Sequence, residues 1–269
     1  MPRDGYDFPT YGIDDGLFYA LHIPSLVCTV SAVSRRFRFF FTSWTNSERL
    51  IVYMAICDGL YNIVHFATHA HVALVRGPVY PRAVCVFYGY GMIVFITAQS
   101  LLVNVVSINA FMLMYLNKRL TLGIFDWRLL VWVFGVPLVG TTTAAIFDQL
   151  GPTGAVCYFD GVKGQKTQLF FNAVPMTIIF IVNIALYIAT WVKIRSKSLE
   201  LRRSLGAKSA AQTATIKAAK SMSLFVGAFF TQWSILTISI AWTMIANSVS
   251  NFLEHLFHLL PDIGVAHFL

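Results

Sequence analysis

The chain has 269 residues, of which 57% are hydrophobic, 15% aromatic and 12% charged. Soluble domains are typically about 25% charged, so this composition and its long apolar runs exclude an ordinary soluble domain and indicate an integral membrane protein. The formal net charge of +8 gives no sign of nucleic-acid binding, because its distribution along the chain follows membrane sidedness.

Seven apolar runs dominate the sequence. A helix needs about 20 residues to cross the hydrocarbon core of a bilayer. The sequence predicts spans near residues 17–38, 48–75, 83–116, 127–148, 168–192, 222–246 and 253–269, the last of them cut off at the chain end. We therefore expect an all-α membrane protein, a seven-transmembrane helix bundle over residues 17–269 that follows a short tail, residues 1–16.

Lys and Arg residues indicate the orientation of this bundle. With the N-terminus outside, most of the 20 Lys and Arg residues lie in loops or span ends on the cytoplasmic side, as the positive-inside rule requires. The acidic tail then lies outside. We predict an extracellular N-terminus and a multi-pass protein of the plasma membrane.

An acid, Asp58, lies near the middle of the second predicted span. A charge at the bilayer centre costs about 2.5–3.5 kcal/mol even on the lenient insertion scale, so intramembrane acids are candidates for function. Asn62 lies one turn above on the same helical face. We interpret Asp58 as the centre of a buried polar hub that holds a cation or a shared proton. The alternative is a protonated acid that serves packing alone.

The third predicted span carries a polar stripe. Thr97, Ser100, Asn104 and Ser107 are spaced three, four and three residues apart, which places them on one helical face. Such a stripe turns into the bundle, because lipid cannot satisfy polar groups. We expect Asn104 and Ser107 to reach Asp58 and complete the hub. Hydrogen bonding between helices for packing alone is an equally open interpretation.

Two of the four cysteines fall on the outer side of the predicted topology. Cys85 lies at the start of the third span, and Cys157 lies in the loop between the fourth and fifth spans. Disulfides persist in the oxidising extracellular compartment. The sequence therefore predicts a disulfide between Cys85 and Cys157, with two unpaired thiols as the alternative. Cys28 and Cys57 lie within spans and are expected to be small buried residues.

Four short motifs follow one another along the chain: "SERLIVYMAICDGLYNI" (47–63), "WVFGVPLVG" (132–140), "CYFD" (157–160) and "TQWSI" (231–235). With seven spans and an outer disulfide, they resemble a G-protein-coupled receptor. The first resembles the span with a mid-membrane acid, and the last resembles a mid-span Trp of the sixth helix. The middle two resemble the fourth span and outer loop of the secretin-like and cyclic-AMP-receptor-like groups, with Tyr158 in place of Trp.

Three features of the sequence depart from the rhodopsin-like and secretin-like patterns and indicate which receptor group it resembles most. The rhodopsin-like Asp-Arg-Tyr is absent from the inner end of the third span, residues 108–120, and the sixth span has no proline. The tail is too short for the hormone-binding domain of secretin-like receptors. The resemblance favours the cyclic-AMP-receptor-like branch. It implies a receptor, with no catalysis, metal or cofactor, that binds an unknown small extracellular ligand and activates a heterotrimeric G-protein.

Side chains in the outer half of the bundle are candidates for the ligand site. Most of the 23 Phe residues are expected to face lipid or the core, so a single Phe carries little weight. Trp233 stands out because it is mid-span and next to Gln232. The candidate ligand-binding residues are His65, His69, Tyr88, Phe171, Asn172 and Trp233.

The longest cytoplasmic loop is expected to run from about Lys193 to Ser221. It is basic, with Glu200 as its one acid, and its Ala- and Lys-rich part is expected to extend the sixth span as a helix. The resemblance places G-protein docking here and at the inner end of the third span. The expected contacts are Lys118, Arg119, Arg202, Arg203, Lys217 and Lys220. Alternatively, these charges only set topology and bind anionic lipid headgroups.

Histidines support a second function class. They lie at the outer end of the second span and in the last span: His65, His69, His71, His255, His258 and His267. Histidines four residues apart on a helix can share a metal. With Asp58 they resemble the seven-span zinc-dependent hydrolases of the ceramidase type, although the outer cysteine pair is unexplained there. A small membrane transporter is a third possibility, although the sequence shows no repeated halves with broken spans.

Overall fold

The computed structural model describes residues 6, 46–118, 120–153, 156–203 and 238, and the side chains of all of these except 46–48, 51 and 198–203. The spans predicted near 17–38 and 253–269, and the one near 222–246 apart from Ile238, lie outside the described residues. The structure of the other four predicted spans is given below.

The described chain is almost entirely helical. Its long helices are α2 (Asn46–Val75), α3 (Arg82–Tyr115) and α7 (Val174–Arg203). The fourth predicted span is built from η3 (Ile124–Asp126), α4 (Trp127–Leu130), η4 (Val131–Gly135) and α5 (Val136–Ile146). The fifth begins with α6 (Gln165–Gln168) and η5 (Leu169–Ala173), which lead into α7. Both η4 and η5 are π-helical turns, which widen the helix locally.

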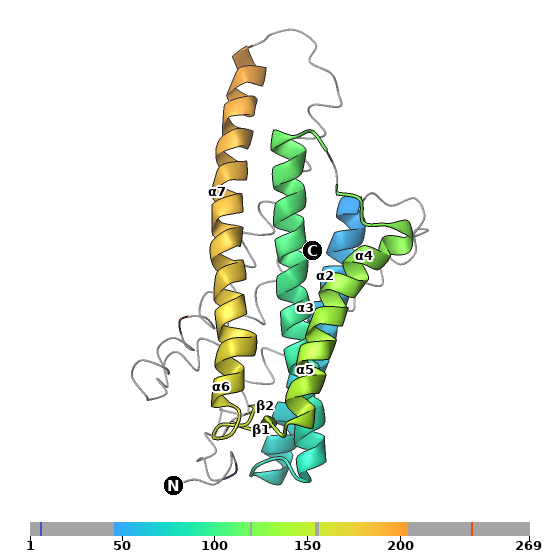
Figure 1. Cartoon of the computed structure of the whole chain (residues 1–269), viewed down its shortest axis with the longest axis vertical. Helices are drawn as coiled ribbons and strands as arrows, with labels where there is room; N and C mark the ends of the chain where they lie inside the picture. The colour runs from blue at the N-terminus through green and yellow to red at the C-terminus, as the bar shows by residue number, and fades with distance from the viewer. Residues whose placement is uncertain (1–5, 7–45, 119, 154–155, 204–237, 239–269) are drawn as a thin grey trace.

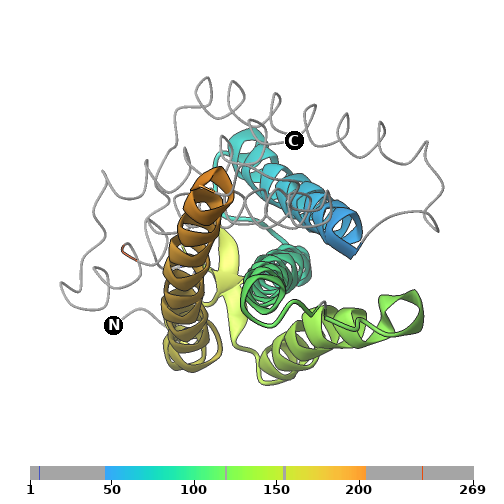
Figure 2. The ribbon, with the colours of Figure 1, turned by 90° about the horizontal axis from the view of Figure 1, so that it is seen from above.

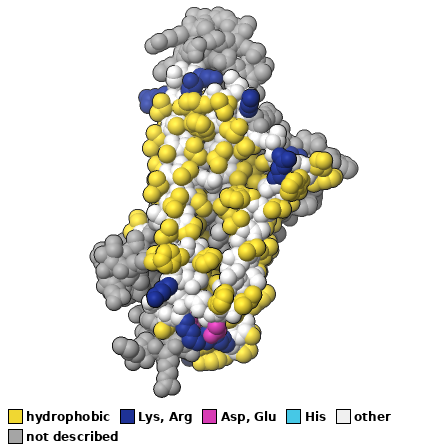
Figure 3. All heavy atoms as spheres, in the orientation of Figure 1, with side chains coloured by type: hydrophobic (Ala, Val, Ile, Leu, Met, Phe, Trp, Pro, Cys, Tyr) yellow, Lys and Arg dark blue, Asp and Glu magenta, His cyan; other side chains and the backbone are white. Residues whose placement is uncertain are grey.

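Among the described residues, three helical segments are long and apolar enough to cross a membrane: Arg82–Tyr115, Ile124–Ile146 and Gln165–Lys197. α2, at 30 residues, also exceeds the length of about 20 that a bilayer requires. On the face that Figure 3 shows, apolar side chains cover the middle, and Lys and Arg side chains gather toward the two ends. This distribution is the one expected of a protein whose surrounding solvent is lipid.

The fifth predicted span is longer than expected. It was predicted to end at residue 192 and to pass into a loop at Lys193, but α7 continues to Arg203. The segment 193–203 contains no Gly or Pro and is rich in Lys, Arg, Leu and Glu, which are good helix formers. The helix therefore continues past the apolar run, and apolar length alone underestimates it.

α3 is the central helix of the described bundle. It contacts α2, α5 and α7, and an end-on view shows it between them (Figures 1 and 2). Residues on all sides of α3 are buried, polar ones such as Gln99 and Ser107 included, as expected for a helix with other helices packed around it. On α5 and α7, by contrast, large apolar side chains such as Val139 and Ile181 are exposed, on surfaces that would face lipid.

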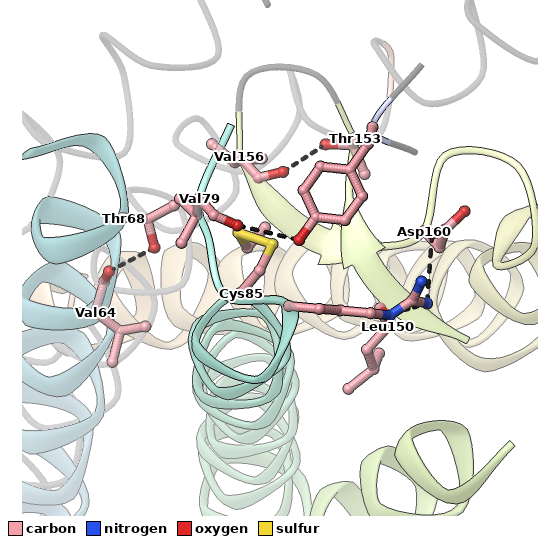
Figure 4. Close-up of a disulfide and its surroundings, with 11 residues drawn as sticks. Val64, Thr68, Val79, Cys85, Leu150, Thr153, Val156 and Asp160 are labelled. Carbon is pink, nitrogen blue, oxygen red and sulfur yellow. Dashed lines mark hydrogen bonds and ion pairs between the residues drawn. A yellow bond between two sulfur atoms is a disulfide. The ribbon is translucent and has the colours of Figure 1, made fainter. Parts of the chain in front are cut away.

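A β-hairpin lies against one end of the bundle (Figure 1). Strands β1 (Leu150–Pro152) and β2 (Cys157–Phe159) pair antiparallel, with Leu150 opposite Phe159. The predicted disulfide between Cys85 and Cys157 is present and ties β2 to the start of α3, with a Cα–Cα distance of 5.2 Å. Figure 4 shows Cys85 beside Val79 and the hairpin.

Two further contacts seat the hairpin on this end, called the disulfide end below. Arg82 of α3 forms ion pairs with Asp148 at 2.9 Å and with buried Asp160 at 3.7 Å. Gly89 allows β2 to approach α3, because a Cβ there would lie 2.9 Å from the Tyr158 carbonyl oxygen. Tyr6, the one described residue of the predicted tail, is at the same end, since its hydroxyl donates to the Val79 carbonyl at 3.1 Å.

Candidate functional site: a polar line through the bundle

Asp58 lies in a polar hub between α2 and α3. Its side chain is 2% exposed. The Asn62 Nδ2 donates to the Asp58 carbonyl oxygen at 2.9 Å and to its Oδ2 at 3.3 Å, one helical turn away as predicted. From α3, the Gln99 Nε2 donates to the Asp58 Oδ1 at 3.2 Å. The carboxyl group therefore receives an amide donor on each of its oxygens.

The partner that α3 supplies differs from the one expected. Asn104 Nδ2 donates instead to Asn183 Oδ1 of α7 at 3.0 Å, and Ser107 Oγ donates to the Val103 carbonyl of its own helix at 2.9 Å. A separation of five residues turns a helix by about 140°, so Asn104 points well away from Gln99. Gln99 faces α2, whereas Asn104 faces α7.

Gln99 and Asn183 are therefore partners in polar contacts that were not among the predicted hub residues. Gln99 is fully buried and lies off the stripe formed by the other polar residues of its span. Its position in the sequence does indicate a polar contact, because a glutamine in the middle of an apolar run needs a hydrogen-bond partner as much as an acid does. Asn183 carries the same signal in the fifth span.

The hub also contains unsatisfied acceptors. Asn62 Oδ1 and Gln99 Oε1 are buried and have no hydrogen-bond partner among the described residues. Leaving a buried acceptor unpaired costs about 1–3 kcal/mol. Carboxyl and amide oxygens are the kind of ligand that a hard cation prefers, and each unpaired amide oxygen can also accept a hydrogen bond from a protonated group.

The two predicted histidines of α2 lie side by side toward the disulfide end. His65 and His69 are buried, and their Nε2 atoms are 3.2 Å apart, so a hydrogen on one nitrogen bridges to the other. The ring of Tyr61 stacks on His65 from one turn below. Within the described part of the chain, no group of three His, Cys, Asp or Glu side chains gathers in a metal-binding arrangement.

A second polar pair lies beneath the hairpin. The Asn172 Nδ2 of η5 donates to the Tyr158 hydroxyl of β2 at 2.6 Å, and the Asn172 side chain is buried. Burial raises the pKa of the Tyr158 phenol well above its ordinary value, and the bond from Asn172 offsets only part of that rise. Tyr158 therefore keeps its proton near neutral pH and can donate a hydrogen bond.

Two other predicted ligand residues lie differently from Asn172. Phe171 is 53% exposed and lies against Gly140 of α5, so the described structure does not bring it into the bundle interior beside Asn172. Adjacent helical residues point about 100° apart, and the chain directs Asn172 inward and Phe171 outward. Tyr88 is half-buried and meets the ring of His71 edge-on at the disulfide end. Trp233 lies outside the described residues.

The predicted G-protein contacts are only partly described. Lys118 is exposed just beyond α3, at the end of the bundle opposite the hairpin. Arg202 and Arg203 are the last residues of α7, at that same end (Figure 1). Arg119, Lys217 and Lys220 lie outside the described residues.

These features define an all-α, multi-pass membrane protein with a buried polar hub around Asp58 and a hairpin anchored by a disulfide. No protein-family model and no curated protein matches its sequence. Its structure is similar to the crystal structure of squid rhodopsin, with a TM-score of 0.73 and 15% sequence identity, over 100% of this chain and 84% of that chain. At this identity the similarity shows the fold alone, and the chain has a rhodopsin-like fold.

Proposed function

We propose that this protein is a G-protein-coupled receptor of the plasma membrane that binds an extracellular ligand and activates a heterotrimeric G-protein. The observation that carries the proposal is the similarity to squid rhodopsin, which extends over the whole chain. In this proposal the chain forms seven spans, and the disulfide end is extracellular. Tyr6 supports that orientation, because it belongs to the tail predicted to lie outside and it lies at the end that holds the disulfide.

The proposed ligand site lies beneath the hairpin. It includes Tyr158, Asn172 and the pair His65 and His69, all buried or half-buried near the disulfide end. Asn172 Oδ1 has no hydrogen-bond partner among the described residues. A ligand that offers a donor to this oxygen and an acceptor to the Tyr158 hydroxyl would satisfy both groups. This arrangement supports a small polar ligand over a purely apolar one.

The proposed switch is the polar hub around Asp58. A transition between states needs an element whose two arrangements differ in free energy, and a buried acid with changeable partners is such an element. Protonation or cation binding would change which amide oxygens remain unsatisfied. The finer assignment to the cyclic-AMP-receptor-like branch is also a proposal, and it rests on the motifs at 132–140 and 157–160.

The second candidate function is a zinc-dependent intramembrane hydrolase. One observation favours it: the Nε2 atoms of His65 and His69, 3.2 Å apart, could both bind one metal ion. The described structure brings no third metal-binding side chain to this pair, and the rest of the predicted histidine set, His255, His258 and His267, lies outside it. The receptor proposal is favoured because it also explains the disulfide-anchored hairpin.

The decisive experiment measures nucleotide exchange. The purified protein in lipid nanodiscs is mixed with each of several heterotrimeric G-proteins, and the exchange rate is compared with that of empty nanodiscs. We expect faster exchange on at least one G-protein class. A matched protein with four basic residues reversed to Glu should lose most of that rate. These residues are Arg202, Arg203, Lys217 and Lys220. No acceleration with any class would refute the proposal.

A further inference from the structure

A buried acid fastens the loop between α3 and α4. This loop, residues 116–126, lies at the end of the bundle opposite the hairpin (Figure 1). Asp126 at its end is fully buried. Its Oδ2 forms an ion pair with the Arg49 Nε at 3.0 Å and accepts a hydrogen bond from the Tyr53 hydroxyl at 3.1 Å. Arg49 and Tyr53 lie four residues apart on α2, so one face of that helix presents both.

The three side chains depend on one another. A buried carboxylate is tolerated only when charges and donors compensate it, and removing one partner leaves an uncompensated charge. Arg49 is partly exposed, whereas Asp126 is shielded from solvent, so the pair lies at the edge of the bundle rather than in its centre. We call Arg49, Tyr53 and Asp126 the loop clamp.

The backbone of the loop is held in a conformation that it would not adopt unaided. Phe125 has φ 54° and Asp126 has φ 59°, both in the left-handed region, and Gly123 has φ 88°. Asp tolerates this region, but an aromatic residue rarely enters it. Such strain persists only where surrounding contacts over-determine the backbone. The loop clamp acts on Asp126 itself, next to the most strained residue.

The remainder of the loop is fastened to the bundle at two more points. The Leu120 backbone N donates to the Asn109 Oδ1 of α3 at 3.2 Å, and Leu122 is buried in the main apolar core. Between the end of α3 and these anchors, Lys118 is exposed, while Phe125 at the turn is 83% exposed. The loop is therefore anchored from beneath and presents a defined outer surface.

We propose that Asp126 is a positioning residue for G-protein docking: through the loop clamp it holds the loop that carries Lys118 in the conformation that the G-protein binds. The inference rests on the receptor function proposed above and adds the element of α2 that controls its docking surface. A pre-ordered loop pays less conformational entropy on binding, so the clamp raises affinity for the G-protein without touching it.

The test measures the order of the loop and the activation of the G-protein in separate experiments. Asp126→Asn removes the charge, keeps the size and suits the left-handed backbone; Arg49→Gln removes the partner charge; a third protein carries both changes. Lys166→Gln, an exposed residue at the disulfide end, is the control for lost charge. Hydrogen exchange of amides 118–128 is measured in nanodiscs without G-protein. Nucleotide exchange is then measured against G-protein concentration.

We expect both single variants to speed exchange of amides 118–128 while amides 150–160 stay unchanged. The half-saturating G-protein concentration should rise about tenfold, equivalent to 1.4 kcal/mol, with the maximal rate less affected. Because both residues act through one contact, the double variant should be no worse than either single one.

Unchanged exchange of amides 118–128 would overturn the clamp. Faster exchange with an unaltered half-saturating concentration, or additive losses in the double variant, would overturn the docking role. Both outcomes leave the receptor function standing, because the unsubstituted protein still activates its G-protein. A protein without substitutions that activates no G-protein would overturn the receptor function, and this inference with it.

Discussion

Asp58→Asn tests whether the polar hub is a switch or only a packing contact. The substitution keeps the size of the side chain and one acceptor oxygen, and it replaces the other oxygen with an amide donor. The hub as described contains two unsatisfied acceptors, Asn62 Oδ1 and Gln99 Oε1. The new amide can donate to one of them, so the folded state should gain a hydrogen bond that the acid in its charged form cannot make.

The magnitude follows from the bonds at this site. One added hydrogen bond contributes about 1 kcal/mol, and hydrogen bonds to a charged group contribute about 1.5–3 kcal/mol. The amide therefore gains about 1 kcal/mol in any state that leaves an acceptor unpaired. It loses a comparable amount in any state in which the carboxylate is ionised and held by the Gln99 donor. A difference of about 1.4 kcal/mol between two states changes their ratio tenfold.

The assay is basal nucleotide exchange on a G-protein at several sodium concentrations and pH values, with receptor amounts matched. We expect the exchange rate of the unsubstituted protein to depend on sodium or pH, and that of Asp58→Asn to lose this dependence and shift about tenfold. Ser100→Ala is the control, because within the described part of the chain the Ser100 Oγ donates to the Ile96 carbonyl of its own helix and makes no bond to the hub.

Coincident curves for Asp58→Asn and the unsubstituted protein, at all sodium concentrations and pH values, would refute the switch. The acid would then serve packing alone. A shift of equal size in Ser100→Ala would show that the assay reports general loosening of α3 rather than the hub.

Three further results are expected. Cys85→Ser should reduce stability by about 2–5 kcal/mol and lower surface expression, and peptide mapping without reductant should recover Cys85 linked to Cys157 in the unsubstituted protein. Reversing the four basic residues at the inner ends of the fifth and sixth spans should weaken G-protein coupling while ligand binding is retained; equal coupling at matched expression leaves those charges a role in topology only. Elemental analysis should find no stoichiometric zinc; about one zinc per chain, lost in His65→Ala, would favour the hydrolase.

The sequence by itself determined the helices of the described spans. In hydrocarbon, a backbone can satisfy its polar groups only within a helix or a closed barrel, so an apolar run of sufficient length specifies a helix almost without reference to its neighbours. The predicted spans near 48–75 and 83–116 therefore agree closely with α2 and α3. Membrane sidedness likewise identified Cys85 and Cys157, because compartment chemistry depends on topology alone.

The tertiary structure alone decided which polar groups meet. Periodicity places Asn104 on one face of its helix. Other helices pack around α3, so no solvent-exposed face distinguishes the side that meets α2 from the side that meets α7. Only the packing shows that Gln99 faces Asp58 while Asn104 faces Asn183. The direction of Phe171 could not be predicted for the same reason, because apolar side chains suit both lipid and core.

The loop clamp is the contact that the sequence indicates least. Tyr53 and Asp126 are 73 residues apart in sequence. No local sequence pattern in the loop or in α2 predicts that the two side chains meet. The acid stands beside an aromatic residue in the left-handed region, a conformation that local propensity disfavours. Local energies therefore oppose this turn, and the free energy that holds it comes from contacts that exist only once α2, α3 and the loop have packed together.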